Sequence, residues 1–118
     1  MPQLIVPIGN ISEEKAEKYL SFCQEKAKRL AQHAEHLSSW ESRCPDQNRW
    51  GGAVRVGDFI FSMSGFPELG DEAIMLATAG IYYKGWQSPK AIDTINIIAE
   101  RSQNPYWSNL LAFLSRWI

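Results

Sequence analysis

Cysteine, surplus charge and long apolar runs are all scarce in this sequence, and each shortage argues against a class of protein. The chain has 118 residues and two cysteines, Cys23 and Cys44. A chain of this length buries roughly two thirds of its unfolded surface. We therefore expect reduced structural thiols, with one disulfide as the lesser alternative. The formal net charge of −1 disfavours nucleic acid as a partner, since such proteins present a basic face.

Membrane and motif signals are also missing. No apolar run approaches the ~20 residues of a membrane-spanning helix, and the N-terminal segment lacks the basic and apolar regions of a secretory signal. We therefore expect a cytoplasmic protein with no membrane partner. The sequence contains no P-loop, GxGxxG, CxxC, HExxH or GxSxG pattern, so nucleotide binding, a zinc ribbon and a nucleophile elbow have no support.

The composition that remains is that of an ordinary globular protein. Hydrophobic residues make up 45% and charged residues 21% of the chain, and the length predicts a single domain over residues 1–118. Residues 4–8 form a short β-prone run that contains Pro7. Because proline cannot donate to a ladder, we expect an edge strand or an extended arm, and the arm is also suited to docking on a partner subunit.

A long helix is expected next, with Asn10 as its N-cap and Glu13 three residues later, as in a capping box. One apolar stripe recurs every three or four positions. Its members are Ala16, Tyr19 or Leu20, Cys23, Ala27, Leu30, Ala34 and Leu37. A helix over residues 12–38 would be about 40 Å long, against roughly 27 Å for a domain of this size. Either it ends early or it protrudes and packs against a second subunit, and we expect the second outcome.

A β-hairpin is the clearest prediction in the middle of the chain. Its strands are Ala53–Val56 and residues 59–63, and Gly57-Asp58 between them suits a type I′ or II′ turn. The polar residues 38–48 before it are expected to be a connecting loop. The apolar face of the hairpin requires a cover of helices.

Three helices are expected after the hairpin. The first, residues 73–83, is apolar or small on nearly every side, which predicts burial all round or a place between the sheet and a subunit interface. Gly80 within it indicates a close crossing with another backbone. Ser88-Pro89 and Asn104-Pro105 are N-cap and first-turn pairs that begin two more helices. The sequence therefore predicts an α+β fold, with a short antiparallel hairpin packed against one long N-terminal and three C-terminal helices.

The turn between the hairpin and its next helix holds the best candidate site. We expect ligand-binding residues at Ser62, Ser64, Gly65, Glu68, Asp71 and Glu72. The three carboxylates suit general acid–base catalysis or cation binding. The favoured interpretation is that they satisfy free N–H groups and the dipole at the start of a helix.

Two histidines and several aromatic residues are lesser candidates. His33 and His36 are three residues apart near the end of the long helix, a spacing that two metal or haem ligands can use. Solvent-facing histidines at the negative helix end are the favoured alternative. Trp40, in a polar loop, is expected to fold back on the domain rim or to contact a partner or ligand. A further set is expected in the core or an interface, with a platform for a ligand as the lesser alternative: Trp86, Tyr106, Trp107 and Trp117.

Residues 51–79 resemble the C-terminal half of the GlcG/HbpS-like family of small α/β proteins. The matching positions are Gly51, Gly52, Val54, Gly57, Ser64, Gly65, Asp71, Glu72 and Ile74. The resemblance implies a ligand-binding or sensing module that assembles into oligomers, in a family linked to haem or corrinoid binding. The family's own ligand residues lie where this sequence has no counterpart, so the resemblance assigns none here.

These observations lead to one expected function and two alternatives. We expect a non-enzymatic domain that forms a homodimer or larger homo-oligomer and binds a small ligand near residues 62–72. The first alternative is a small enzyme that uses Glu68, Asp71 or Glu72. The second is a haem or metal binder that uses His33 and His36.

Overall fold

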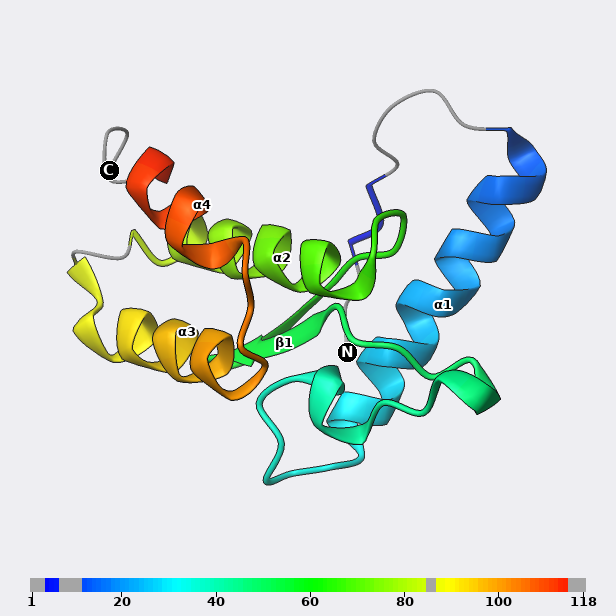
Figure 1. The fold of residues 1–118 in the computed structure, drawn as a ribbon, viewed down its shortest axis with the longest axis horizontal. Helices are drawn as coiled ribbons and strands as arrows, with labels where there is room; N and C mark the ends of the chain where they lie inside the picture. The colour runs from blue at the N-terminus through cyan, green and yellow to red at the C-terminus, as the bar shows by residue number, and fades with distance from the viewer. Residues whose placement is uncertain (1–3, 7–11, 85–86, 115–118) are drawn as a thin grey trace.

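A two-stranded antiparallel hairpin lies between the long N-terminal helix and three C-terminal helices (Figure 1). This is the α+β arrangement that the sequence predicts. The structure is a computed structural model that describes residues 4–6, 12–84 and 87–114. In chain order its elements are α1 (Glu13–Ala31), the short 3-10 helices η1 (Ser39–Ser42) and η2 (Pro45–Gln47), β1 (Ala53–Val56), β2 (Phe59–Ser62), α2 (Glu68–Tyr82), α3 (Pro89–Arg101) and α4 (Trp107–Leu114).

The hairpin forms where it is predicted. Val56 pairs with Phe59 across the two-residue turn. Gly57 has a φ of 62° while Asp58 has no positive φ, which fits the type II′ turn of the two predicted forms. Strand β2 ends one residue earlier than expected, although the Met63 N–H still donates to the carbonyl oxygen of Gly52 at 3.2 Å.

Each face of the hairpin is covered by a different group of helices. Val54 and Val56 are fully buried in the core formed with α2 and α3. Because side chains alternate along a strand, Arg55 and Ser62 point to the other face. There Ser62 exchanges two hydrogen bonds with Cys23 of α1. The hairpin therefore links α1 to the helices that follow it.

Helix α1 ends at Ala31, so the predicted continuation through residue 38 and the protruding rod are wrong. Its 19 residues span about 28 Å. The guanidinium of Arg55 donates hydrogen bonds to four carbonyl oxygens around this end of the helix. These acceptors belong to Leu30, His33, Ala34 and His36. In a longer helix these carbonyl oxygens would accept hydrogen bonds from backbone N–H groups. Here they accept them from a side chain of the hairpin.

The start of α1 and the segment before it also differ from expectation. Ser12 is the N-cap, and its hydroxyl oxygen accepts a hydrogen bond from the Lys15 N–H at 3.3 Å. Asn10 lies outside the described residues. Residues 4–6 form no strand and are exposed, and the remainder of the predicted edge strand, residues 7–8, lies outside the described part of the chain.

The segment that precedes the hairpin covers the outer edge of β1. The Arg55 N–H donates to the Leu37 carbonyl oxygen at 2.7 Å, and the Ala53 N–H donates to the hydroxyl of Ser39 at 3.0 Å. Ser38 also forms a bridge with Val54. The predicted loop over residues 38–48 is thus a connection whose first residues are buried, because β1 needs hydrogen-bond partners on that side.

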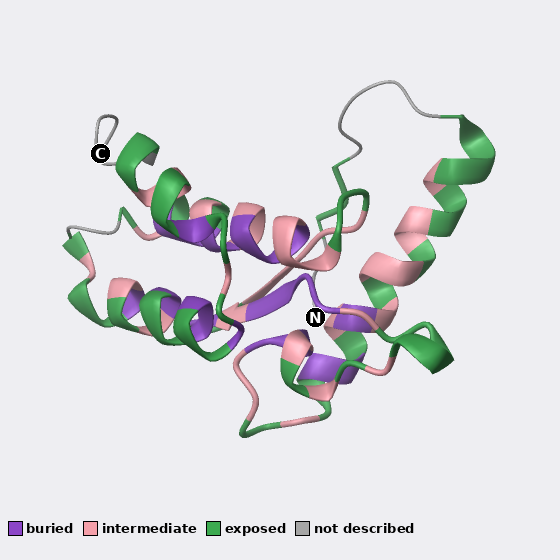
Figure 2. Cartoon of the chain, viewed as in Figure 1, coloured by how far each residue is buried: buried purple, intermediate pink, exposed green. Residues whose placement is uncertain are grey.

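Helix α2 is buried on one side only, so burial all round is wrong, and the alternative place between the sheet and a subunit interface stays a prediction. Ile81 and Tyr82 are 55% and 57% exposed, and Figure 2 shows the buried positions on the inner side of the helix. An added Cβ at Gly80 would first meet the Cδ1 atom of Ile95, at 3.7 Å. The helix therefore passes a side chain of α3 at this point, not a second backbone.

Helices α3 and α4 complete the core. The buried residues of α3 are Ala91, Ile95, Ile98 and Ala99, which share one face of the helix at spacings of three and four. Trp107 at the start of α4 is 6% exposed and donates its indole N–H to Asn96 at 3.1 Å. Across the described ranges, no helix has the length and apolarity needed to cross a membrane.

Candidate functional site

A cleft of about 600 Å³ lies between α1 and the turn that leads into α2. Small-molecule sites commonly occupy 300–1,000 Å³, so its size suits a small ligand. Helix α1 contributes Lys18, Tyr19, Phe22 and Lys26 to the lining. The other lining residues are Trp40, Asn48, Trp50, residues 64–69, Asp71 and Tyr106.

The cleft exists because the hairpin covers only part of α1. Cys23 is held to the end of β2 by its thiol, which donates to the Ser62 carbonyl oxygen at 3.2 Å, and by the Ser62 hydroxyl, which donates to the Cys23 carbonyl oxygen at 2.8 Å. Tyr19 lies one turn before Cys23 and is only half-buried. Of the apolar stripe, Tyr19 is the member that lines the cleft.

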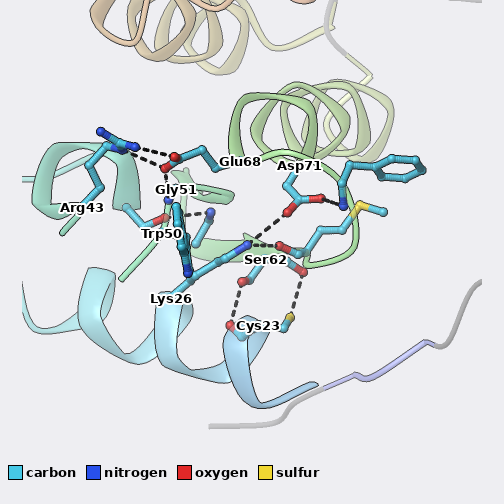
Figure 3. Close-up of polar contacts among 12 residues, drawn as sticks. Cys23, Lys26, Arg43, Trp50, Gly51, Ser62, Glu68 and Asp71 are labelled. Atoms are coloured by element: carbon cyan, nitrogen blue, oxygen red, sulfur yellow. Dashed lines mark hydrogen bonds and ion pairs between the residues drawn. The ribbon is translucent and has the colours of Figure 1, made fainter. Parts of the chain in front are cut away.

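A buried ion pair forms the base of the cleft (Figure 3). Lys26 and Asp71 are 2% and 1% exposed, and Lys26 Nζ lies 3.1 Å from Asp71 Oδ2. The ammonium also donates to the Met63 carbonyl oxygen at 2.7 Å, while Asp71 Oδ1 accepts the Phe66 N–H at 2.9 Å. Burial raises the pKa of Asp71 above its ordinary value, although the neighbouring Lys26 charge opposes the rise.

Sequence reasoning missed Lys26. The available signal was its position, because a residue three after Cys23 and four before Leu30 lies on the apolar stripe and not on the polar face. Gly52 makes the buried ammonium possible. A Cβ at Gly52 would lie 2.7 Å from Lys26 Nζ and 2.9 Å from the Cβ of Asp71.

Glu68 forms a second ion pair beside the first. Its carboxylate accepts hydrogen bonds from Arg43 at 2.8 and 2.5 Å and from the Gly51 N–H at 2.9 Å. Burial alone would raise the pKa of Glu68, but the hydrogen bonds from Arg43 and Gly51 and the charge of Arg43 together lower it. Arg43 also lies over the ring of Trp40, 4.4 Å from its centroid.

The third predicted carboxylate, Glu72, does not reach the cleft. It is fully buried in the core. It accepts hydrogen bonds from Ser38 at 2.6 Å, Ser102 at 2.5 Å and Asn104 at 2.8 Å. The structure therefore gives three different environments to the carboxylates that the sequence grouped together.

The other predicted site residues also fall into two groups, one that lines the cleft and one that does not. Ser64 and Gly65 line the cleft with Glu68 and Asp71, whereas Ser62 is used to join β2 to α1. The oxygens of Glu68 and Asp71 meet two cations and loop N–H groups. The favoured interpretation, in which they satisfy the first turn of α2, does not describe these contacts.

Two tryptophans from the loop before the hairpin line the cleft. Trp40 folds back on the domain, as predicted for one of its alternatives, and Trp50 lies near it. Arg29 positions this loop, since its guanidinium donates to the carbonyl oxygens of Trp50 at 2.5 Å and Ser39 at 3.1 Å. Arg29 is 5% exposed, so this charged side chain is buried between α1 and the loop.

The histidine pair does not have the geometry of a metal site. The rings of His33 and His36 are stacked, with centroids 4.7 Å apart and planes 5° from parallel. Nitrogen lone pairs lie in the ring planes, so two such rings cannot aim at one ion. His33 Nδ1 lies 2.7 Å from the Arg29 carbonyl oxygen. Among the residues that the structure describes, no group of three or more His, Cys, Asp or Glu is placed to hold a metal.

The remaining aromatic predictions have separate outcomes. Tyr106 lies on the rim of the cleft and is 47% exposed, while Trp107 is in the core, as predicted. Trp86 and Trp117 lie outside the described residues. Cys23 and Cys44 are both free thiols.

Comparison of the chain with protein-family models, with curated proteins and with solved structures finds no match. The resemblance of residues 51–79 to the GlcG/HbpS-like family therefore stays a prediction.

Proposed function

We propose that this protein is a non-enzymatic binding domain that takes a small ligand into the cleft between α1 and the 64–69 turn. The observation that carries this proposal is the aromatic lining of a cleft of about 600 Å³. Six aromatic side chains contribute to it: Tyr19, Phe22, Trp40, Trp50, Phe66 and Tyr106. Ligand sites commonly have apolar and aromatic walls and a few polar groups that fix the orientation of the ligand.

The polar groups at the bottom of the cleft favour ligand binding over catalysis. A general acid or base must exchange a proton with the substrate. Glu68 is held ionised by Arg43, and both oxygens of Asp71 already have hydrogen-bond donors. These ion pairs form a preorganised floor of the cleft, which keeps the surrounding aromatic walls in place.

The proposal is tested with a small-molecule library and two matched variants. Compounds that raise the melting temperature are titrated while the tryptophan fluorescence, to which Trp40 and Trp50 contribute, is recorded. Tyr19→Ser is expected to weaken binding about tenfold or more, since stacking contacts contribute ~1 kcal/mol beyond area burial. Ile97→Ser is the control, because Ile97 is 43% exposed on α3 and does not line the cleft. Equal weakening by both variants, or no stabilising compound at all, would contradict the proposal.

Of the three carboxylates named in the enzyme alternative, Asp71 is the one that still supports it. It is the one predicted carboxylate in the described cleft whose pKa is raised, and it lies beside the amine of Lys26. A dyad of this kind suits proton transfer. Product analysis after prolonged incubation with each library ligand tests this alternative. Turnover that disappears in Asp71→Asn would favour an enzyme, whereas ligand recovered unchanged would favour the binding domain.

We also infer self-association, through the apolar helix after the hairpin that the sequence indicated for an interface. The first helix ends at Ala31 and gives no support, whereas α2 carries apolar side chains on its exposed side. Three exposed apolar side chains support self-association: Phe59, Ile81 and Tyr82, with exposed fractions of 48%, 55% and 57%. The rings of Phe59 and Tyr82 are in edge contact at 5.4 Å. Exposed apolar groups that adjoin in this way are common in protein interfaces.

A further inference from the structure

Lys18 is the one charged side chain in the described lining of the cleft that has no ion-pair partner. Lys26 and Asp71 neutralise each other, and Glu68 is neutralised by Arg43. Glu14, which is four residues before Lys18 and suited to pair with it, does not do so. The ammonium of Lys18 lies instead 6.0 Å from the centroid of the Phe22 ring. A bound ligand therefore meets one uncompensated positive charge.

The cationic and aromatic groups of α1 are arranged along a single line. Lys18, Phe22 and Lys26 are spaced by four residues each, so they follow one face of the helix over about 12 Å. Phe22 lies one turn after Lys18 and one turn before Lys26 on this face. A flat ring placed on Phe22 would have Lys18 at its outer end and the buried ion pair at its inner end.

Lys26 offers a further hydrogen bond at the inner end. A lysine ammonium has three protons, and the structure uses two of them, on Met63 and Asp71. No other described residue accepts the third proton, and Lys26 lines the cleft. Because Asp71 already neutralises its charge, this N–H suits an uncharged acceptor such as a carbonyl or hydroxyl oxygen.

We infer that the cleft selects a planar aromatic ligand with one anionic group, the anion beside Lys18 and an uncharged acceptor beside Lys26. This inference rests on the proposed function and names the ligand class of the same site. A dianionic phosphate is disfavoured, because it calls for an arginine fork or several cations, and the Arg43 fork is occupied by Glu68. A cationic ligand would meet Lys18 while both nearby carboxylates are already paired.

The test uses three probes with the same ring: naphthoate, naphthamide and naphthylmethylammonium. Isothermal titration calorimetry gives the Kd of each, and saturation-transfer NMR confirms contact with the ring. Naphthoate is expected to bind two- to fivefold tighter than naphthamide, which corresponds to about 0.4–1 kcal/mol and lies in the range for a partly exposed ion pair. In 1 M salt, where the Debye length is ~3 Å, this preference is expected to vanish.

Lys18→Gln is expected to abolish the preference for naphthoate and to leave naphthamide binding unchanged. Lys15→Gln is the matched control, since it removes one charge from the same helix at an exposed position outside the cleft. A preference that survives in Lys18→Gln, or that Lys15→Gln abolishes equally, would overturn the inference.

The two proposals fail in different ways. If naphthamide or the ammonium probe binds as tightly as naphthoate, the ligand class is wrong, while a binding cleft is supported. If none of the probes contacts the protein, the ligand class is again wrong, and the library screen with Tyr19→Ser decides on the binding function.

Discussion

Glu72 shows how a single side chain joins distant parts of this chain. Its carboxylate accepts hydrogen bonds from Ser38 before the hairpin and from Ser102 and Asn104 after α3. All three donors are uncharged, so the carboxylate is held by hydrogen bonds alone. Asn104 also donates to the Leu69 carbonyl oxygen at 2.8 Å, which extends the network to the start of α2.

Replacing Glu72 by alanine should therefore destabilise the fold strongly. Ser38 and Asn104 would each lose an acceptor, whereas Ser102 keeps the Ile98 carbonyl oxygen at 3.2 Å, and each buried unsatisfied group costs about 1–3 kcal/mol. We expect a loss of about 3 kcal/mol or more in the free energy of unfolding, measured by urea denaturation. Glu72→Gln, which keeps the shape and one oxygen, should lose less. Glu100→Ala at an exposed position of α3 is the control, and a similar loss there would contradict this account.

Glu68 should make the stability depend on pH in the acid range. Its pKa is lower in the folded state than its ordinary value of 4.5, so its contribution is present above that value and is lost as the pH falls below it. We expect Glu68→Gln to be less stable than the wild type at pH 7, and the difference to shrink below about pH 4.5. Urea denaturation at a series of pH values measures it.

The titration of Asp71 does not affect the comparison of the wild type with Glu68→Gln. Its raised pKa has the opposite sign, so its contribution falls as the pH rises above 3.8, but both proteins in the comparison contain it. A difference between wild type and Glu68→Gln that is constant from pH 7 to pH 3 would show that the Arg43 pair does not lower the pKa of Glu68.

At the scale of elements, Arg55 determines where α1 ends. Its guanidinium lies against carbonyl oxygens at and just beyond the end of α1, including Leu30 at 2.9 Å and His36 at 2.5 Å. Helix end and hairpin are thus one unit. The apolar stripe of the first helix continues to Leu37 in the sequence, so periodicity alone could not locate this end.

Arg55→Met should separate these two elements. Hydrogen bonds from a charged donor contribute about 1.5–3 kcal/mol, and several are lost together, so we expect a destabilisation of about 2 kcal/mol or more. Arg55→Lys should be intermediate, because it keeps the charge without the planar fork. The exposed Arg49→Met is the control in thermal denaturation, and equal melting temperatures for the two methionine variants would exclude the proposed role.

Two glycines should respond to alanine in opposite directions. Gly52 has a φ of 124°, and a Cβ there would lie within 3.0 Å of three neighbours. Gly52→Ala should therefore cost at least about 2 kcal/mol. Gly70 lies within α2, and its added Cβ would make an ordinary contact with Phe66 at 3.4 Å. Gly70→Ala should stabilise by about 0.5–1 kcal/mol, and denaturation midpoints with the same sign for both would contradict the backbone argument.

At the scale of the molecule, the three exposed apolar side chains and the cleft are separate features. Phe59, Ile81 and Tyr82 lie at the hairpin turn and the C-terminal end of α2, whereas the cleft lies at the other end of the hairpin. Ligand binding and self-association can therefore be varied independently.

Light scattering coupled to size exclusion should give a mass above the 13.4 kDa of one chain at tens of micromolar. Tyr82→Ser combined with Ile81→Ser should reduce that mass, because it removes the apolar contact area. Tyr19→Ser in the cleft is the control and should leave the mass unchanged. A wild-type mass of 13.4 kDa would exclude self-association under these conditions.

Local patterns in the sequence were sufficient for the class of fold and for most elements. The hairpin, its turn and the stripe of α3 follow from side-chain periodicity and from glycine and proline positions, which act over a few residues. The predicted turn after the hairpin does border the cleft, and four of its six predicted residues line it. These features needed no knowledge of distant contacts.

The tertiary structure decided the remainder. Where α1 ends depends on Arg55, the base of the cleft depends on a Lys26–Asp71 pair 45 residues apart, and Glu72 belongs to the core because Ser38 and Ser102 meet it there. Each of these depends on which buried polar group finds a partner, and burial makes an unsatisfied group costly. Periodicity records which face of an element is apolar, but it contains no information on which distant polar side chain completes that face.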